Sequence, residues 1–116
     1  MADVVYFVRD MMFTSKIREV ASQLGLTAQG TPDVAALARA AAGARLVIID
    51  LRLPQALEAL DALAADPAAA AVPRVGFVDH EKVDVMDAAR AHGCGRVLAK
   101  GQFAKELPSL LRPAAP

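Results

Sequence analysis

Residues 44–54 read ARLVIIDLRLP, and this stretch decides the fold. Four consecutive apolar residues, Leu46 to Ile49, run without a break into Asp50. A short apolar run rich in β-branched residues is typical of a strand that is buried on both faces of a parallel sheet. Asp50 would then lie at the carboxyl end of that strand, the edge where open α/β sheets place their functional groups.

Length and composition indicate one domain with a conventional core. The chain has 116 residues, of which 55% are hydrophobic, and no run approaches the roughly 20 apolar residues of a membrane span. The amino terminus lacks a signal-peptide pattern, so we expect a cytoplasmic protein with no membrane contact. The formal net charge is zero and aromatic residues make up 4%. Nucleic acid is therefore not an expected partner, since its binding needs basic surfaces and stacking side chains.

Strand-like apolar runs alternate with helical patterns along the whole chain. The predicted strands are residues 4–8, 26–30, 46–49, 75–78 and 96–99. The predicted helices are residues 13–24, 32–42, 55–65 and 81–92, followed by a short last helix around 107–111. Because proline cannot sit deep inside a helix, Pro108 is expected in the first turn of that last helix.

This alternation predicts a doubly wound α/β domain, a three-layer sandwich around a five-stranded parallel sheet. Short right-handed crossovers favour the flavodoxin-like strand order 2-1-3-4-5. Asp10 then follows the first strand, Asp50 ends the third, and Lys100 ends the fifth. We expect these three side chains to converge on one crevice, because the carboxyl ends of parallel strands share an edge. Residues 1–112 should form this single domain, with 113–116 as a frayed tail.

The pattern resembles the receiver domain of bacterial response regulators over nearly the whole chain. Asp10, Asp50 and Lys100 carry the resemblance, together with Pro54, which stands four residues after Asp50 as in the family's D-x-x-x-P loop. The resemblance implies that Asp50 is the phosphoacceptor and Lys100 the phosphate partner. It also implies that any bound Mg²⁺ is weakly held by Asp10, Asp50 and the backbone carbonyl of Arg52.

Five positions depart from the pattern of that family. In the family two acidic residues follow the first strand, and Arg9 stands in place of the first of them, before Asp10. The other departures are Val78 for threonine or serine, Asp79 for a small residue, Val97 for an aromatic residue, and Gly101 for proline. Arg9 replaces a charge that supports the metal with a permanent positive charge, and Asp79 would repel an incoming phosphate. We therefore expect metal binding and phosphorylation to be weak or lost.

Two alternatives are open for each of the basic residues near the crevice. Arg9 either forms an ion pair with Asp50 or Asp10, its guanidinium standing where magnesium would sit, or points to solvent. Lys100 either binds phosphate or pairs with Asp50 without any phosphate.

The resemblance implies a stand-alone signalling module, not an enzyme, whose partner is a histidine kinase, a downstream signalling protein or a second copy of the chain. One alternative is a fully phosphorylatable single-domain response regulator of a two-component phosphorelay. Another is a flavodoxin-like ligand-binding module or small enzyme, although no glycine-rich phosphate loop follows the first strand.

Two groups of apolar residues are candidates for contact with a partner. By analogy with the family, the partner face would include Val85, Met86, Val97, Phe103 and Leu107. Met11 and Met12, expected in the loop after the first strand, either form an exposed patch or fold back onto the first helix.

Overall fold

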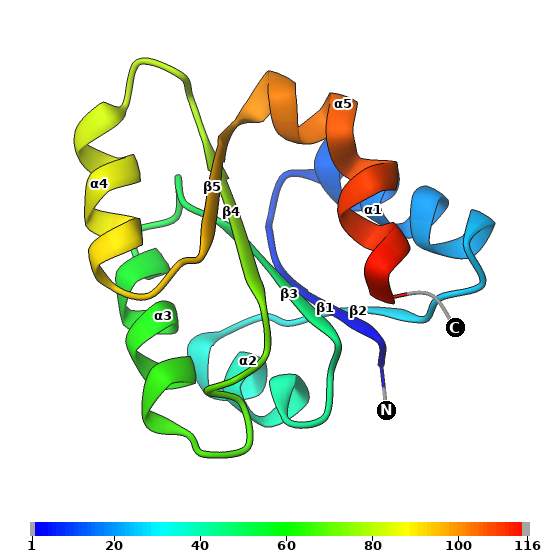
Figure 1. Cartoon of the computed structure of the whole chain (residues 1–116), viewed down its shortest axis with the longest axis horizontal. Coiled ribbons are helices and arrows are strands. Elements are labelled where there is room, and N and C mark those ends of the chain that lie inside the picture. The colour runs from blue at the N-terminus through cyan, green and yellow to red at the C-terminus, as the bar shows by residue number, and fades with distance from the viewer. Residues whose placement is uncertain (1, 115–116) are drawn as a thin grey trace.

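A computed structural model describes residues 2–114 as a five-stranded parallel sheet between helices (Figure 1). The strands are β1 Val4–Phe7, β2 Ala28–Gly30, β3 Leu46–Asp50, β4 Arg74–Val78 and β5 Arg96–Ala99. The helices are α1 Met11–Gln23, α2 Val34–Ala41, α3 Ala56–Ala65, α4 Val83–Ala91 and α5 Lys100–Leu111, followed by the short 3-10 helix η1 Arg112–Ala114. The strand order is β2-β1-β3-β4-β5, which confirms the predicted fold class.

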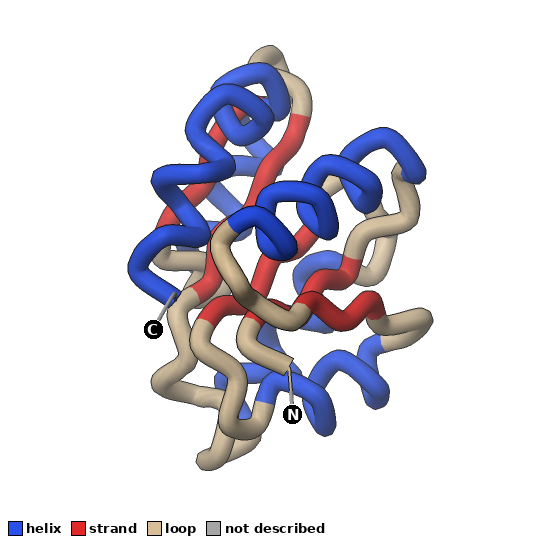
Figure 2. The backbone as a smooth tube through the Cα atoms, turned by 90° about the vertical axis from the view of Figure 1, so that its right-hand side faces the viewer, coloured by secondary structure: helices blue, strands red, loops and turns tan. Residues whose placement is uncertain are grey.

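The sheet separates two apolar clusters. Alternate side chains of β1 point to opposite faces, so Val4 and Tyr6 join one cluster while Val5 and Phe7 join the other. Helices α1 and α5 cover the first face, and α2, α3 and α4 cover the second (Figures 1 and 2). Burial on both faces explains why β3 is a continuous apolar run. Within residues 2–114, no helix has the length and apolar character needed to cross a bilayer.

Two aspartates fix where the first helices begin. The carboxylate of Asp10 accepts hydrogen bonds from the backbone N–H groups of Met12 and Phe13 at 2.9 and 3.2 Å, so α1 begins two residues before the predicted start. Asp33 accepts from the backbone N–H of Ala36 at 2.8 Å, so α2 begins after the predicted proline position. Each is an N-cap, which satisfies amide groups that a helix leaves without partners.

The last helix is longer than predicted. Helix α5 begins at Lys100, which places Pro108 near its carboxyl end and not in its first turn. Proline removes one backbone hydrogen bond there. Burial of four large side chains on one face outweighs that loss; they are Phe103, Leu107, Leu110 and Leu111.

The predicted frayed tail is wrong for residues 113 and 114. These residues belong to η1, and Ala114 is buried. The backbone carbonyl of Ala114 also accepts a hydrogen bond from Nη1 of Arg45 at 3.0 Å. Residues 115 and 116, which the same prediction covered, lie outside the described part of the chain.

The close packing around Gly76 in β4 leads to a stability prediction. A Cβ atom at this position would lie 2.8 Å from Cδ1 of Leu51 and 3.1 Å from Sγ of Cys94, and both neighbours are buried. Gly76→Ala should therefore lower the free energy of unfolding by about 1–3 kcal/mol through overpacking. Urea denaturation measures the change. Gly95→Ala is the control, because its Cβ would meet no atom within 4 Å; equal stability of the two variants would contradict the prediction.

Candidate functional site

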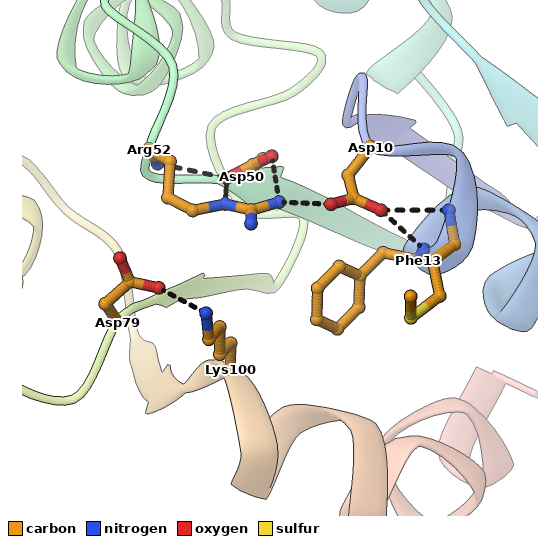
Figure 3. A network of polar contacts seen from close by, with 7 residues as sticks. Asp10, Phe13, Asp50, Arg52, Asp79 and Lys100 are labelled. Carbon is orange, nitrogen blue, oxygen red and sulfur yellow. Dashed lines mark hydrogen bonds and ion pairs between the residues drawn. The ribbon is translucent and has the colours of Figure 1, made fainter.

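The carboxyl edge of the sheet brings together the ionisable residues that the sequence predicted to converge (Figure 3). Asp10 follows β1, Asp50 ends β3, and Lys100 opens α5 directly after β5. Asp79, which follows β4, joins them at the same edge. Asp50 is almost fully buried, with 2% of its surface exposed, so its charge must be balanced by protein groups.

Arg52 balances that charge. Its Nε donates to Oδ1 of Asp50 at 2.8 Å, and its Nη2 donates to Oδ2 at 2.9 Å. The backbone N–H of Arg52 also donates to Oδ1 at 3.0 Å. Two parallel bonds between a guanidinium and a carboxylate are among the strongest polar contacts in proteins. Both carboxylate oxygens of Asp50 are thus engaged by one residue of the following turn.

The same guanidinium reaches across the crevice to Asp10. Its Nη2 lies 3.4 Å from Oδ2 of Asp10, the oxygen that does not cap α1. The pKa of Asp10 is lowered, first by the hydrogen bond from the backbone N–H of Phe13 and further by that of Met12 and the charge of Arg52. Arg52 therefore bridges the two carboxylates that follow β1 and end β3 (Figure 3).

Aromatic rings form one wall for this arginine. The central carbon of its guanidinium lies 5.3 Å from the ring centre of Phe13 and 5.4 Å from that of Phe77, within the range of a cation–π contact. Phe77 in turn stacks on Phe103 with ring centres 4.4 Å apart. Hydrogen bonding to Asp50 raises the pKa of Arg52 above its already high usual value. The crevice thus holds a fixed cation that is permanently charged.

A second ion pair lies beside the first. Nζ of Lys100 is 3.0 Å from Oδ1 of Asp79. This oxygen is shielded from solvent and has no hydrogen bond of good geometry within residues 2–114, so the lysine charge is its main compensation. The pKa of Asp79 is lowered, with Lys100 as the largest cause. The hypothesis that Lys100 pairs with Asp50 is wrong, because Lys100 forms its ion pair with Asp79 and Arg52 bonds both carboxylate oxygens of Asp50.

In the described part of the chain, Arg9 forms no ion pair or hydrogen bond with the crevice residues. Its Nη2 donates to the backbone carbonyl of Pro32 at 3.0 Å on the exposed side of the sheet edge. Of the two alternatives for Arg9, the ion pair with Asp10 or Asp50 is therefore wrong, and Arg52 supplies the guanidinium between them. The spacing Asp-x-Arg was the available signal, since it places an arginine in the turn that leaves the strand.

The other departures from the family pattern lie in β4, β5 and α5. Val78 is buried at the end of β4 and is paired in register with Ala99. Val97 is half-buried in β5, and Gly101 is exposed in the first turn of α5. None of the three brings a hydroxyl or an aromatic ring to the crevice.

The predicted partner face needs a correction. Phe103 and Leu107 are fully buried, because they lie on the side of α5 that packs on the sheet. Val85, Met86 and Val97 are half-buried against the cluster beneath α4.

The two methionines after β1 are exposed and do not fold back. Met11 and Met12 lie in the first turn of α1, not in a loop, and are 82% and 79% exposed. Of the two alternatives for these methionines, the exposed patch therefore agrees with the structure.

The carboxylates as arranged do not fit a magnesium ion. Mg²⁺ binds carboxylate and carbonyl oxygens in near-octahedral geometry. Here Arg52 bonds both oxygens of Asp50 and faces the free oxygen of Asp10. Within residues 2–114, no three His, Cys, Asp or Glu side chains are grouped so that they could hold a metal.

No family model matches the sequence, and no curated protein matches it. Solved structures do match. A response regulator from Hahella chejuensis superposes with a TM-score of 0.81 at 19% identity, over 98% of this chain and 95% of that chain. The chemotaxis response regulator CheY4 of Vibrio cholerae gives a TM-score of 0.79 at 17% identity over 98% of both chains.

A third match comes from the receiver domain of the sensor histidine kinase PA1611 of Pseudomonas aeruginosa PAO1. It has a TM-score of 0.79 at 19% identity and covers 97% of this chain and 95% of that chain. That structure holds a magnesium ion coordinated in its active-site cleft. The chain has the receiver-domain fold. The resemblance found in the sequence is thereby confirmed as a likeness of fold.

In this receiver fold, Asp10 has two roles that substitution can separate. Asp10→Ala should lower the free energy of unfolding by about 1–2 kcal/mol because α1 loses its N-cap. Asp10→Asn keeps an acceptor for the helix cap and loses only the charge that faces Arg52. It should therefore lower the free energy of unfolding by only about 0–1 kcal/mol. Urea denaturation measures both. The control pair is Asp33→Ala and Asp33→Asn, which alters the α2 cap alone. The assignment would be contradicted if Asp10→Asn lowered the free energy of unfolding as much as Asp10→Ala.

The ion pair between β4 and α5 predicts a change in titration. In Lys100→Met the pKa of Asp79 should rise toward the usual aspartate value, because the charge that lowers it is removed. Because the pKa of Asp79 is lower in the folded chain than in the unfolded chain, the ion pair stabilises the fold at pH values above the usual aspartate pKa. This stabilisation is lost as the pH falls through the pKa of the folded state. Carboxyl ¹³C NMR follows Asp79 directly. Lys105→Met removes an exposed lysine of the same helix and should leave the titration unchanged; an unaltered Asp79 in Lys100→Met would contradict the assignment.

Proposed function

We propose that this chain is a receiver-like signalling module that acts through protein–protein contacts and in which phosphorylation of Asp50 is weak or lost. The contact that supports the proposal is the two-point bond between Arg52 and Asp50. A module of this kind would carry its signal in the surface it presents to a partner and not in a phosphoryl group.

The chemistry of aspartyl phosphorylation explains why that contact matters. A carboxylate oxygen must be free to attack phosphorus, and a cation must neutralise the charge that the phosphoryl group brings. Freeing either oxygen of Asp50 breaks a charge-assisted bond worth about 1.5–3 kcal/mol. A metal ion would also have to displace the guanidinium that bridges Asp50 and Asp10. Arg52 therefore disfavours both nucleophilic attack by Asp50 and binding of the metal that normally assists it.

The fully phosphorylatable response regulator remains the alternative that one observation favours. Asp10, Asp50 and Lys100 lie at the same sheet edge (Figure 3), and the side chain of Arg52 is 27% exposed. In that alternative, Arg52 swings outward when magnesium and a phosphodonor arrive, and its charge then faces the phosphoryl group.

The contact surface that we propose lies on α4 and β5. Val83 is 58% exposed at the start of α4. The half-buried Val85 and Met86 follow it on α4, and together with Val97 of β5 they pack against the same apolar cluster. Apolar side chains at such a surface are typical of protein contacts. A histidine kinase, a downstream signalling protein or a second copy of the chain would be the partner.

Phosphorylation of the purified protein tests the proposal. We expect the wild-type chain to gain little phosphoryl mass from acetyl phosphate with Mg²⁺. Arg52→Ala should gain about tenfold more, because the guanidinium no longer competes with phosphorus and the metal for the carboxylate of Asp50. Intact-protein mass spectrometry measures the gain. Asp50→Asn in the Arg52→Ala background should abolish it.

Arg9→Ala is the matched control, since Arg9 lies at the same edge and, among residues 2–114, its side chain bonds only the carbonyl of Pro32. It should behave as the wild type. Wild-type protein that is phosphorylated as readily as Arg52→Ala would overturn the proposal in favour of the fully phosphorylatable alternative.

A further inference from the structure

A pocket of about 350 Å³ opens between α1 and α5 beside the crevice. From α1 it is lined by Met12, Phe13 and Lys16, which share one face of the helix because they are spaced by three and four residues. Gly101 and Ala104 line it from α5. Pockets that bind small molecules have volumes of about 300–1,000 Å³, so this one suits a small ligand.

Most of the pocket surface is apolar, and its charges are mainly positive. Phe13, Met12 and Ala104 provide the apolar walls. Arg52 and Lys100 line the side nearest the crevice, and Lys16 lies on α1. Asp10 is the one acidic residue among those that line it.

The one carboxylate that lines the pocket in the described chain is already engaged, whereas hydrogen-bond donors are left over. Asp10 bonds two N–H groups of α1 with one oxygen and faces Arg52 with the other. Within residues 2–114, Nη1 of Arg52 has no acceptor, and Lys16 has neither an ion pair nor a hydrogen bond. The guanidinium can donate through Nη1 without releasing Asp50, because it holds Asp50 through Nε and Nη2.

We propose that this pocket binds a small amphipathic anion, an organic carboxylate, sulfonate or phosphate with an apolar body. The apolar body packs against Phe13, Met12 and Ala104. The anionic group bonds Lys16 and the free Nη1 of Arg52. This binding does not depend on the proposed function, because it requires neither metal nor phosphorylation of Asp50.

Fluorescence titration with anilinonaphthalene sulfonate tests the proposal on the full chain. The sequence contains no tryptophan, so no energy transfer from that residue contributes to the emission of the probe. We expect saturable binding at one site. The neutral analogue phenylnaphthylamine, which lacks the sulfonate, should bind about fivefold more weakly or worse, because it gains nothing from the two cations.

Substitutions in the pocket locate the binding. Gly101→Leu should abolish it by filling the space, and there is room for the first side-chain atom, because a Cβ at Gly101 meets no atom within 4 Å. Ala104→Phe fills the pocket from the next turn of α5. Lys16→Ala should weaken sulfonate binding about two- to fivefold, while Lys105→Ala, on the exposed side of α5, should leave it unchanged.

Amide NMR shifts of the wild-type chain provide the second measurement. Shifts centred on Met12, Lys16 and Ala104 are expected, and thermal unfolding of each variant verifies that it is folded. Equal affinity for the neutral and sulfonated probes would overturn the proposal. So would undiminished binding in both filling variants, or NMR shifts confined to another surface.

Discussion

The bond between Arg52 and Asp50 determines the state of the crevice. The strand that precedes Asp50 is buried on both faces, so its carboxylate emerges where water cannot balance its charge. Arg52 supplies that balance from within the same turn and reaches Asp10 as well. The rings of Phe13 in α1 and Phe77 in β4 lie against its guanidinium. One side chain thus connects the helix cap, the buried acid and the aromatic core.

The sequence was sufficient for the fold because its signals are local and mutually consistent. Buried parallel strands read as apolar runs, and glycines 25, 43 and 93 follow the helices with positive φ angles of 72, 82 and 94°. The errors arose where packing outweighed propensity. Pro108 predicts a short last helix, yet burial of that helix's apolar face extends it back to Lys100. Ala114 falls in the predicted frayed tail, yet it is buried and its carbonyl accepts a hydrogen bond from Arg45.

The convergence of Asp10, Asp50 and Lys100 could be predicted because topology alone places strand ends together. Their pairing could not, because it depends on the reach and direction of long side chains. The sequence pattern points to Arg9 as the partner and to Arg52 only through its backbone carbonyl, whereas the turn after β3 places the guanidinium of Arg52 on Asp50. Burial of Phe103 likewise depends on which side of α5 meets the sheet.

The two contacts of Arg52 differ greatly in sequence separation. Its partner Asp50 is two residues away, whereas Asp10 is 42 residues away. A contact within one turn can form while the chain is still open, but the longer one must await the pairing of β1 with β3, since closing the loop costs entropy. Asp50 can therefore enter the closing interior already matched with its cation. Forming the contacts in that order would spare the folding chain the burial of an isolated charge.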